Sequence, residues 1–234
     1  MPNGHRGAPR ELILLVRDAC SIDLFVETGT FRAATAVWAS SHFSHVVTIE
    51  NSAPIHAEAL RRYGHIGNID FLSGNSRNIL EQVSGSRPDT AIYWLDAHWS
   101  GGETYGDNDE CPLLDEIAVI NRRKKEDVIL IDDARLFLSP PPRPHKIENW
   151  PSIDAVVDAL RDRSVAPYIV INDDVIVAVP GSIKDRVATY CQDRTTRQWH
   201  TPGARALQAL LAPLNQAKRL FAGSSRTGKP PASQ

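Results

Sequence analysis

The sequence is poor in cysteine, has no excess of basic residues and lacks long apolar runs, and each shortage excludes a class of protein. Its 234 residues hold three cysteines, Cys20, Cys111 and Cys191, which are widely spaced and odd in number. This pattern favours free thiols in a reducing compartment over a disulfide framework. No base is evident beside Cys111, so a buried thiol is a better interpretation than a catalytic one. We therefore expect a cytoplasmic protein.

Basic residues do not outnumber acidic ones. Lysine and arginine total 26 against 28 aspartate and glutamate residues, and the sequence pI is about 6.4. Because neutralising nucleic-acid phosphates needs a basic face, we expect no nucleic-acid partner. The early apolar segment at residues 11–20 is interrupted by Arg17 and Asp18, so neither a signal peptide nor a membrane span is predicted.

Strand-like and helix-like segments alternate along the chain after a Gly/Pro-rich arm at residues 1–9. Strands separated by helices of about ten residues indicate βαβ units and a parallel sheet. The last two β-rich segments follow each other so closely that they must form an antiparallel hairpin. Strands are predicted at 23–28, 45–50, 69–74, 90–98 and 127–134, the hairpin at 167–173 and 174–181, and helices at 10–19, 31–43, 53–64, 76–84, 111–125 and 152–163.

The predicted fold class is therefore α/β, with a doubly wound, Rossmann-like sheet that is mostly parallel and ends in a C-terminal antiparallel hairpin. We expect a single domain at residues 1–190, since the chain is long enough for one large core. From Arg194 onward there are seven Lys or Arg residues and no Asp or Glu. Residues 191–234 are accordingly predicted to form a basic helix followed by a disordered tail.

Polar residues follow all five parallel strands at their carboxyl ends, where open parallel sheets bind ligands. Random placement would scatter such residues over both ends of the sheet. We therefore expect one functional site at this edge. The five sets are Glu27-Thr28-Gly29-Thr30, Glu50, Gly74-Asn75-Ser76, Asp96-Ala97-His98 and Asp132-Asp133.

The first two strand ends predict a nucleoside cofactor that carries no phosphate. Glu50 can accept two hydrogen bonds from the hydroxyls of an adenosine ribose, and Gly29 lets a ligand approach the backbone closely. A pyrophosphate would need more glycines than this turn has, and the carboxylate of Glu27 would repel it. S-adenosylmethionine has a sulfonium, an ammonium and a free ribose diol but no phosphate, so it fits these residues.

The segments VETGTF, VVTIE, LSGNS, YWLDAHWSGG and VILIDDA, in this order and with the terminal hairpin, resemble the class I S-adenosylmethionine-dependent methyltransferases over residues 10–181. Relatives carry Gly-Gly where this chain has Ala33-Ala34, whose methyl groups would narrow the approach to the cofactor just after Thr30. The resemblance implies that Glu27 and Gly29 line the methionine part, Glu50 the ribose and Asn75-Ser76 the adenine edge. The full predicted set of cofactor-binding residues is Glu27, Thr28, Gly29, Thr30, Glu50, Asn75, Ser76 and Asp96.

Three carboxylates, Asp96, Asp132 and Asp133, end two neighbouring strands, and they would repel one another unless a cation lies between them. Oxygen ligands select a hard divalent ion, Mg²⁺ first. The cluster resembles that of the small metal-dependent O-methyltransferases of sugars and catechols, which implies that these three residues bind the ion. The alternative is that Asp132 or Asp133 caps the next segment and no metal binds.

His98 and Asp96 are the predicted catalytic residues. His98 lies two residues after Asp96 and would face the same side of a regularly continuing strand, where it would act as the base or as a group near the metal; a purely structural histidine is the alternative. The metal would lower the pKa of an acceptor hydroxyl, and the resulting alkoxide would attack the methyl group. The expected activity is thus O-methylation of a small polyhydroxylated acceptor such as a sugar or glycoside.

Other interpretations stay open. A metal-dependent hydrolase would leave Glu27, Gly29 and Glu50 without a role, and a non-catalytic adenosyl-binding module would not need Asp96. Sparse glycines disfavour a dinucleotide-dependent oxidoreductase. The loop from Trp99 to Glu110 is long enough for a lid, and its acidic residues are interpreted as solvated. The apolar N-terminal helix and the C-terminal helix could mediate a homodimer as easily as cap the core.

Overall fold

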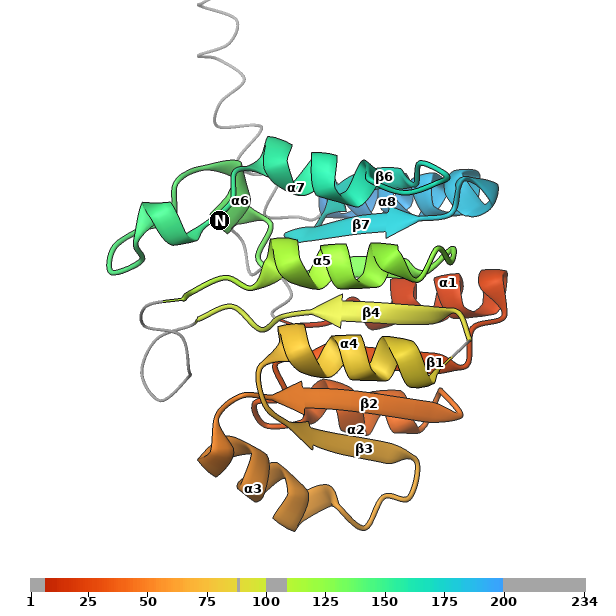
Figure 1. The fold of residues 1–234 in the computed structure, drawn as a ribbon. Coiled ribbons are helices and arrows are strands. Elements are labelled where there is room, and N and C mark those ends of the chain that lie inside the picture. Colours follow the sequence, from red (N-terminus) through yellow and green to blue (C-terminus); the bar gives the residue numbers. More distant parts are fainter. Residues whose placement is uncertain (1–6, 88, 100–108, 200–234) are drawn as a thin grey trace, which may run out of the picture. The chain divides into compact units, whose positions relative to one another are not determined.

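The computed structural model describes residues 7–87, 89–99 and 109–199, and its centre is a seven-stranded sheet (Figure 1). The strand order is β3-β2-β1-β4-β5-β7-β6; β1 to β5 pair in parallel, and β7 is antiparallel to both β5 and β6. This confirms the predicted α/β class and the terminal hairpin. The strands are β1 Leu24–Thr28, β2 His45–Glu50, β3 Ile69–Ser73, β4 Ala91–Leu95, β5 Val128–Ile131, β6 Tyr168–Asn172 and β7 Val175–Val179.

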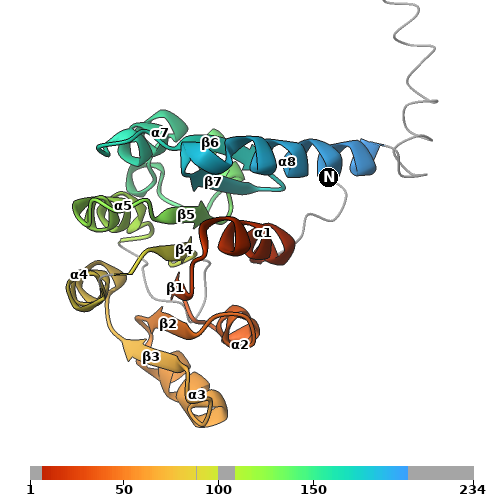
Figure 2. The same ribbon diagram turned by 90° about the vertical axis from the view of Figure 1, so that its right-hand side faces the viewer.

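Helices cover both faces of this sheet (Figure 2): α4, α5 and α7 lie on one face, and α1 and α2 lie on the other. The α-helices are α1 Arg10–Cys20, α2 Ala34–Ser40, α3 Ala53–Tyr63, α4 Ser76–Ser86, α5 Leu113–Arg122, α6 Arg135–Leu138, α7 Ile153–Arg161 and α8 Lys184–Trp199, with 3₁₀ turns at Ile147–Asn149 and Gly181–Ile183.

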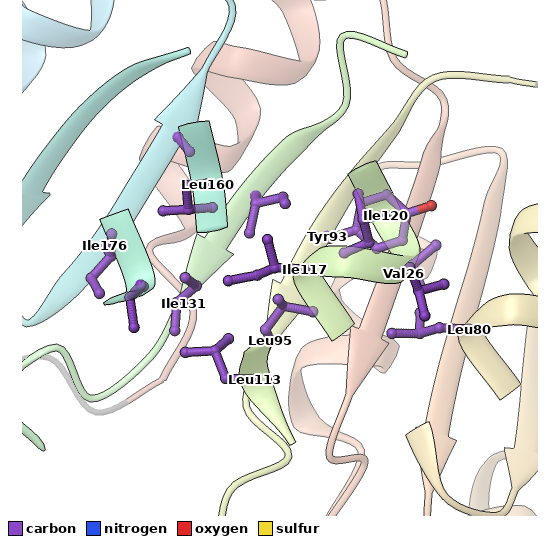
Figure 3. Close-up of a cluster of buried hydrophobic side chains, with 14 of the residues drawn as sticks. Val26, Leu80, Tyr93, Leu95, Leu113, Ile117, Ile120, Ile131, Leu160 and Ile176 are labelled. Atoms are coloured by element: carbon purple, nitrogen blue, oxygen red, sulfur yellow. The ribbon is translucent and has the colours of Figure 1, made fainter. Parts of the chain in front are cut away.

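Four of the five inner strands, β1, β4, β5 and β7, are buried along their whole length. Burial on both faces explains why β4, β5 and β7 are continuous apolar runs that do not alternate; β1 differs in ending with the buried polar residues Glu27 and Thr28. Leu113, Ile117 and Ile120 of α5 belong to the core cluster, together with Leu95 of β4 and Ile131 of β5 (Figure 3). Burying each such side chain stabilises the fold by about 1.5–3 kcal/mol.

The hairpin turns at two aspartates. Asp173 and Asp174 have φ values of 50° and 70°. They are therefore the two residues with left-handed backbone that a type I′ turn requires. This turn matches the twist of the strands it joins, so β7 folds back beside β5 and β6 becomes the outer strand.

Two elements beside the predicted site are shorter than expected. The helix predicted from residue 31 begins at Ala34, because Phe31 and Ala33 have φ values of 44° and 58°, which a right-handed helix excludes. The strand predicted to continue to His98 ends at Leu95. The premise that a continuing strand places Asp96 and His98 on one face is therefore wrong.

By internal contacts the chain divides into residues 1–188 and 189–234, and α8 continues across this division. The predicted boundary at residue 190 stays a prediction, and most of the predicted basic tail lies outside the described residues. Cys20 and Cys111 form no disulfide among the described residues. Over the described ranges, no helix combines the length and apolarity needed to cross a membrane.

Candidate active site

A pocket that is open to solvent lies at the carboxyl edge of the sheet. It receives residues from the ends of β1, β2, β3 and β4. Glu27 and Thr28 at the end of β1, and Thr30 in the turn that follows, are predicted residues whose side chains are buried. The predicted residues that line the pocket are Gly29, Glu50, Asn75, Ser76, Asp96 and His98.

Gly29 brings the first turn against the fourth strand end. Its φ is 86°, and a Cβ atom at this position would lie 2.3 Å from the carbonyl oxygen of Asp96. Its N–H donates to the carbonyl of Ile49 at 2.9 Å. Only a glycine permits this backbone and this contact together, so β1, β2 and β4 meet at one residue.

Glu50 is fixed by the backbone on both sides. Its Oε2 accepts a hydrogen bond from the N–H of Phe31 at 2.9 Å, and its Oε1 accepts one from the N–H of Ser52 at 2.8 Å. Each carboxylate oxygen keeps a second acceptor position. The carboxylate can therefore still accept hydrogen bonds from a pair of ligand hydroxyls, in an orientation that the two backbone bonds set.

Glu27 is a buried carboxyl group among hydroxyl groups. The hydroxyl of Thr48 donates to its Oε2 at 2.7 Å, and the Thr30 hydroxyl lies 2.7 Å from that of Thr48. Burial raises the pKa of Glu27 to about 8; the bond from Thr48 opposes this shift, and the charges of Asp96 and Glu50 add to it. The ionised form of Glu27 is thus unfavourable unless a positive charge comes near it.

Two of the carboxyl groups that follow β4 and β5, those of Asp96 and Asp132, also have raised pKa values. Burial raises the pKa of Asp96 to about 7; the charge of His98 opposes this shift, and the charge of Asp132 adds to it. Burial and the charge of Asp133 raise the pKa of Asp132 to about 6. The expected repulsion within this cluster is therefore present.

His98 lies between the two carboxylates that the sequence placed beside it. Its Nε2 is 2.7 Å from Oδ2 of Asp133 and 3.8 Å from Oδ1 of Asp96. Burial alone would lower the pKa of His98, but the hydrogen bond to Asp133 and the charges of Asp96 and Asp133 outweigh it and raise the pKa. The other oxygen of Asp133 lies 2.6 Å from Nη1 of Arg135, which also pairs with Asp174.

As they lie, these side chains do not fit a metal ion. Among residues 7–87, 89–99 and 109–199, no group of three or more His, Cys, Asp or Glu side chains is arranged to hold one. Asp133 gives one oxygen to His98 and the other to Arg135, so an ion could bind there only if one of these pairs opened. The metal set of Asp96, Asp132 and Asp133 stays a prediction.

Sequence reasoning missed Glu116, a carboxyl group on α5. Its side chain is buried, and Oε1 has no hydrogen-bond partner among the described residues. Burial raises its pKa to about 7, while the hydroxyls of Ser76 and Thr28 oppose the shift. Glu116 lies three residues after Leu113 and four before Ile120, and this spacing, which puts it on the buried stripe of the helix, is the signal that could have found it.

Of the acidic residues just before α5, Glu110 is buried, which corrects the sequence interpretation for this residue, while Asp109 is exposed but paired. Oδ2 of Asp109 lies 2.5 Å from Nη1 of Arg77, and both residues line the pocket. Glu110 is only 1% exposed and accepts hydrogen bonds from His145 and Trp150. These donors are more than thirty residues away in the chain, so local composition could not reveal them. Residues 100–108, which include most of the predicted lid, are outside the described ranges.

Comparison with known proteins shows which solved structures share this fold. No protein-family model matches the chain, and no curated protein matches it. An O-methyltransferase from Bacillus cereus in complex with SAH (S-adenosylhomocysteine) is 14% identical, covers 76% of this chain and 84% of its own, and has a TM-score of 0.53. The SAH-bound methyltransferase PaMTH1 from Podospora anserina is 14% identical, with 76% and 82% covered and a TM-score of 0.50. The chain thus has the fold of the class I S-adenosylmethionine-dependent methyltransferases, as the resemblance implied.

Proposed function

We propose that this protein is an S-adenosylmethionine-dependent O-methyltransferase that acts on a hydroxyl group of a small polyhydroxylated molecule, such as a sugar or glycoside. The observation that carries the proposal is the single pocket that joins Gly29 and Glu50 to Asp96 and His98. A nucleoside-binding edge and an acid–base group therefore face the same space, on a fold whose solved relatives include SAH-bound methyltransferases.

The residues of the first three strand ends fit this cofactor. Glu50 accepts hydrogen bonds from the ribose diol, and Asn75 and Ser76 line the adenine edge. The carboxyl group of Glu27 accepts a hydrogen bond from an uncharged hydroxyl group. A positively charged ligand would therefore add an attraction that this hydroxyl does not provide. When bound, S-adenosylmethionine supplies a methyl group on a positively charged sulfur, which suits a site rich in carboxylates.

His98 takes the proton of the acceptor hydroxyl in this proposal. Its Nε2 is engaged with Asp133, so Nδ1 is the ring nitrogen that accepts the proton, and Asp133 stabilises the imidazolium that forms. Asp96 faces both His98 and the pocket and orients the acceptor. S-adenosylmethionine, held by Glu50, Asn75 and Ser76, would supply the methyl group that the acceptor oxygen receives and would leave as neutral S-adenosylhomocysteine, while His98 would hold the proton released by the acceptor.

Whether the protein binds magnesium is a question separate from the cofactor and the acceptor. Binding at Asp96, Asp132 and Asp133 requires Asp133 to release His98 or Arg135, so no step above depends on the ion. Calorimetric titration of magnesium chloride into the wild type and into Asp132→Asn tests it. Heat in the wild type alone would support the metal set, and no heat in either would remove magnesium while leaving the cofactor assignment intact.

The test of the cofactor assignment is calorimetric titration with S-adenosylhomocysteine. We expect micromolar one-to-one binding by the wild type, and at least about tenfold weaker binding by Glu50→Gln, because a charge-assisted hydrogen bond contributes about 1.5–3 kcal/mol. Glu81→Gln is the matched control, since Glu81 is an exposed residue of α4 that pairs with Arg122; its affinity should equal that of the wild type.

No binding by the wild type would overturn the proposal. The acidic cluster would then be the only functional feature left, and a metal-dependent hydrolase would become the better hypothesis. Binding that is equal in the wild type and Glu50→Gln would show that the ligand lies elsewhere. A non-catalytic adenosyl-binding module would bind S-adenosylhomocysteine but would transfer no methyl group, and Asp96→Ala would leave its behaviour unchanged.

A further inference from the structure

Glu110 is the centre of a buried cluster, here called the Glu110 cluster, that also contains His145 and Trp150. Oε2 of Glu110 accepts hydrogen bonds from Nε1 of Trp150 at 2.6 Å and from Nδ1 of His145 at 3.0 Å, and Oε1 accepts one from the N–H of Lys146 at 3.0 Å. Burial alone would raise the pKa of Glu110, but the hydrogen bonds from Trp150, Lys146 and His145 outweigh it, so the pKa is lowered. The cluster therefore holds an ionised carboxylate.

This cluster joins two distant segments of the chain. The N–H of Trp99, just after β4, donates to the carbonyl of Glu110 at 2.8 Å, while His145 and Trp150 come from the segment between α6 and α7. The ring of His145 stacks edge-on against Trp99 and against Trp150, at centroid distances of 5.5 Å and 5.0 Å. One carboxylate thus fastens the residues that follow β4 to those that follow β5.

The cluster ends at His98. The Trp150 ring lies edge-on to the His98 ring, with centroids 5.5 Å apart, and its other neighbour is Phe137 of α6. The hydrogen bond to Asp133 fixes the position of Nε2 of His98, but the imidazole ring could still rotate about this hydrogen bond. The indole of Trp150, which lies beside the ring, limits that rotation. The indole is in turn fixed by its N–H bond to Glu110, since Trp150 is only 8% exposed and an unpaired N–H there would be costly.

We propose that Glu110 is a positioning residue for the reaction, which holds Trp150 against His98 and thereby sets the direction of Nδ1. The inference rests on the proposed function, in which Nδ1 takes the acceptor proton. Glu110 does not act as the base itself, because both of its oxygens are occupied by donors of the cluster. Its effect is on geometry, where a displacement of about 1 Å can slow a reaction by about 100-fold.

The experiment observes His98 directly, so it needs no acceptor. Protein labelled with ¹³C-histidine is studied by NMR, and the His98 ring signal is assigned by its loss in His98→Asn. In the wild type we expect one sharp signal displaced by the ring current of Trp150. In Glu110→Ala we expect the signal to move towards the position of an unstacked histidine and to broaden. Glu148→Ala, an exposed residue of the same segment, is the matched control and should leave the signal in place.

A double-mutant cycle separates positioning through the indole N–H from a general structural role. In Trp150→Phe, which lacks this N–H, the further change Glu110→Ala should alter the His98 signal much less than it does in the wild type. An unchanged His98 signal in Glu110→Ala, or equal changes in both backgrounds, would overturn the inference. If Glu110→Ala does not fold, Glu110→Gln, which keeps the size but lacks one acceptor oxygen, replaces it in the cycle.

Binding of S-adenosylhomocysteine distinguishes this inference from the proposed function. Neither Glu110 nor Trp150 is among the residues that line the pocket, so Glu110→Gln should bind S-adenosylhomocysteine within about twofold of the wild type. Failure of the wild type to bind would overturn the proposed function. Normal binding with an undisturbed His98 would overturn the role of Glu110 alone.

Discussion

Two carboxyl groups at the same edge of the sheet, that of Glu27 near the end of β1 and that of Asp133 after β5, have opposite pKa shifts. Glu27 has the hydroxyl of Thr48 as its partner, and burial raises its pKa to about 8. Asp133 is also partly buried, but its hydrogen bond to His98 and the charge of Arg135 outweigh the burial and lower its pKa. One carboxylate lacks a compensating cation, and the other has two positively charged or protonatable partners.

This difference indicates which kind of ligand each half of the site accepts. A buried carboxylate that the chain does not neutralise is best stabilised by a positive charge from a ligand, and S-adenosylmethionine carries positive charge. The half around Asp133 already has its cations, so it suits a neutral acceptor hydroxyl and a proton transfer. The predictions below test this contrast, from the largest expected effect to the smallest.

Removing the imidazole from the compensated half should have the largest effect. In His98→Ala, methyl transfer from radiolabelled S-adenosylmethionine to the acceptor should fall by about 10²–10⁴-fold, because a positioned general base contributes that much. Affinity for S-adenosylhomocysteine should change little, since the cofactor residues remain. His65→Ala, an exposed histidine after α3, should be fully active, and full activity in His98→Ala would assign the proton transfer to another group.

The next largest effect is expected from adding a side chain at Gly29, where the two halves of the site are in close contact. In Gly29→Ala, the new Cβ would lie 2.3 Å from the Asp96 carbonyl oxygen at a φ of 86°. The free energy of unfolding should fall by about 2–4 kcal/mol, from the strained backbone and the overpacking together, and S-adenosylhomocysteine binding should be lost. Chemical denaturation measures the first. Gly67→Ala, where a Cβ meets nothing within 4 Å, should show neither change.

The fold could be read from the sequence because it depends on patterns that are local. Continuous apolar runs such as Val128–Ile131 report burial on both faces, and the neighbouring aspartates Asp173 and Asp174 report the turn between two β-rich segments. The direction of parallel strands determines the edge at which the polar residues gather, so the sequence alone predicts that Glu50, Asn75 and Asp96 share one site.

What the sequence could not show are pairings that only the folded chain creates. Arg135 neutralises Asp133 across a turn, and Glu110 meets Trp150 from forty residues away. His98 is a further example. The sequence predicts that a continuing strand places it beside Asp96, but in the structure both residues lie in the turn after Leu95. Charge patterns therefore identified the carboxylates, but their electrostatic partners required the structure.

Removing the charge of the uncompensated half should produce opposite effects on stability and on binding. The pKa of Glu27 is raised above its ordinary value of 4.5 to about 8 in the folded protein. Its contribution to stability is therefore fully present below about pH 4.5 and is lost as the pH rises towards 8. Glu27→Gln does not titrate, so its stability relative to the wild type should increase over this pH range.

Denaturation at pH 5 and at pH 8.5, in the absence of ligand, checks this prediction. The variant should gain stability relative to the wild type only at the higher pH, and at that pH it should bind S-adenosylmethionine more weakly. Thr48→Val keeps the carboxyl group but removes its hydroxyl donor, so it should raise the pKa of Glu27 further and extend the loss of stability to higher pH. A pH-independent difference between Glu27→Gln and the wild type would contradict the raised pKa.

The smallest effect is expected at Ala33, in the turn that follows the uncompensated half. Ala33 is fully buried and has a φ of 58°, a left-handed backbone that costs a residue with a Cβ about 1–2 kcal/mol. Ala33→Gly removes this strain but adds flexibility to the unfolded chain worth about 0.5–1 kcal/mol. The free energy of unfolding should therefore rise by no more than about 1 kcal/mol. The matched change Ala34→Gly, at the first residue of α2, should instead lower the free energy of unfolding, because it adds flexibility to the unfolded chain without the relief of strain. Equal losses in both variants would show that the turn at Ala33 is not strained.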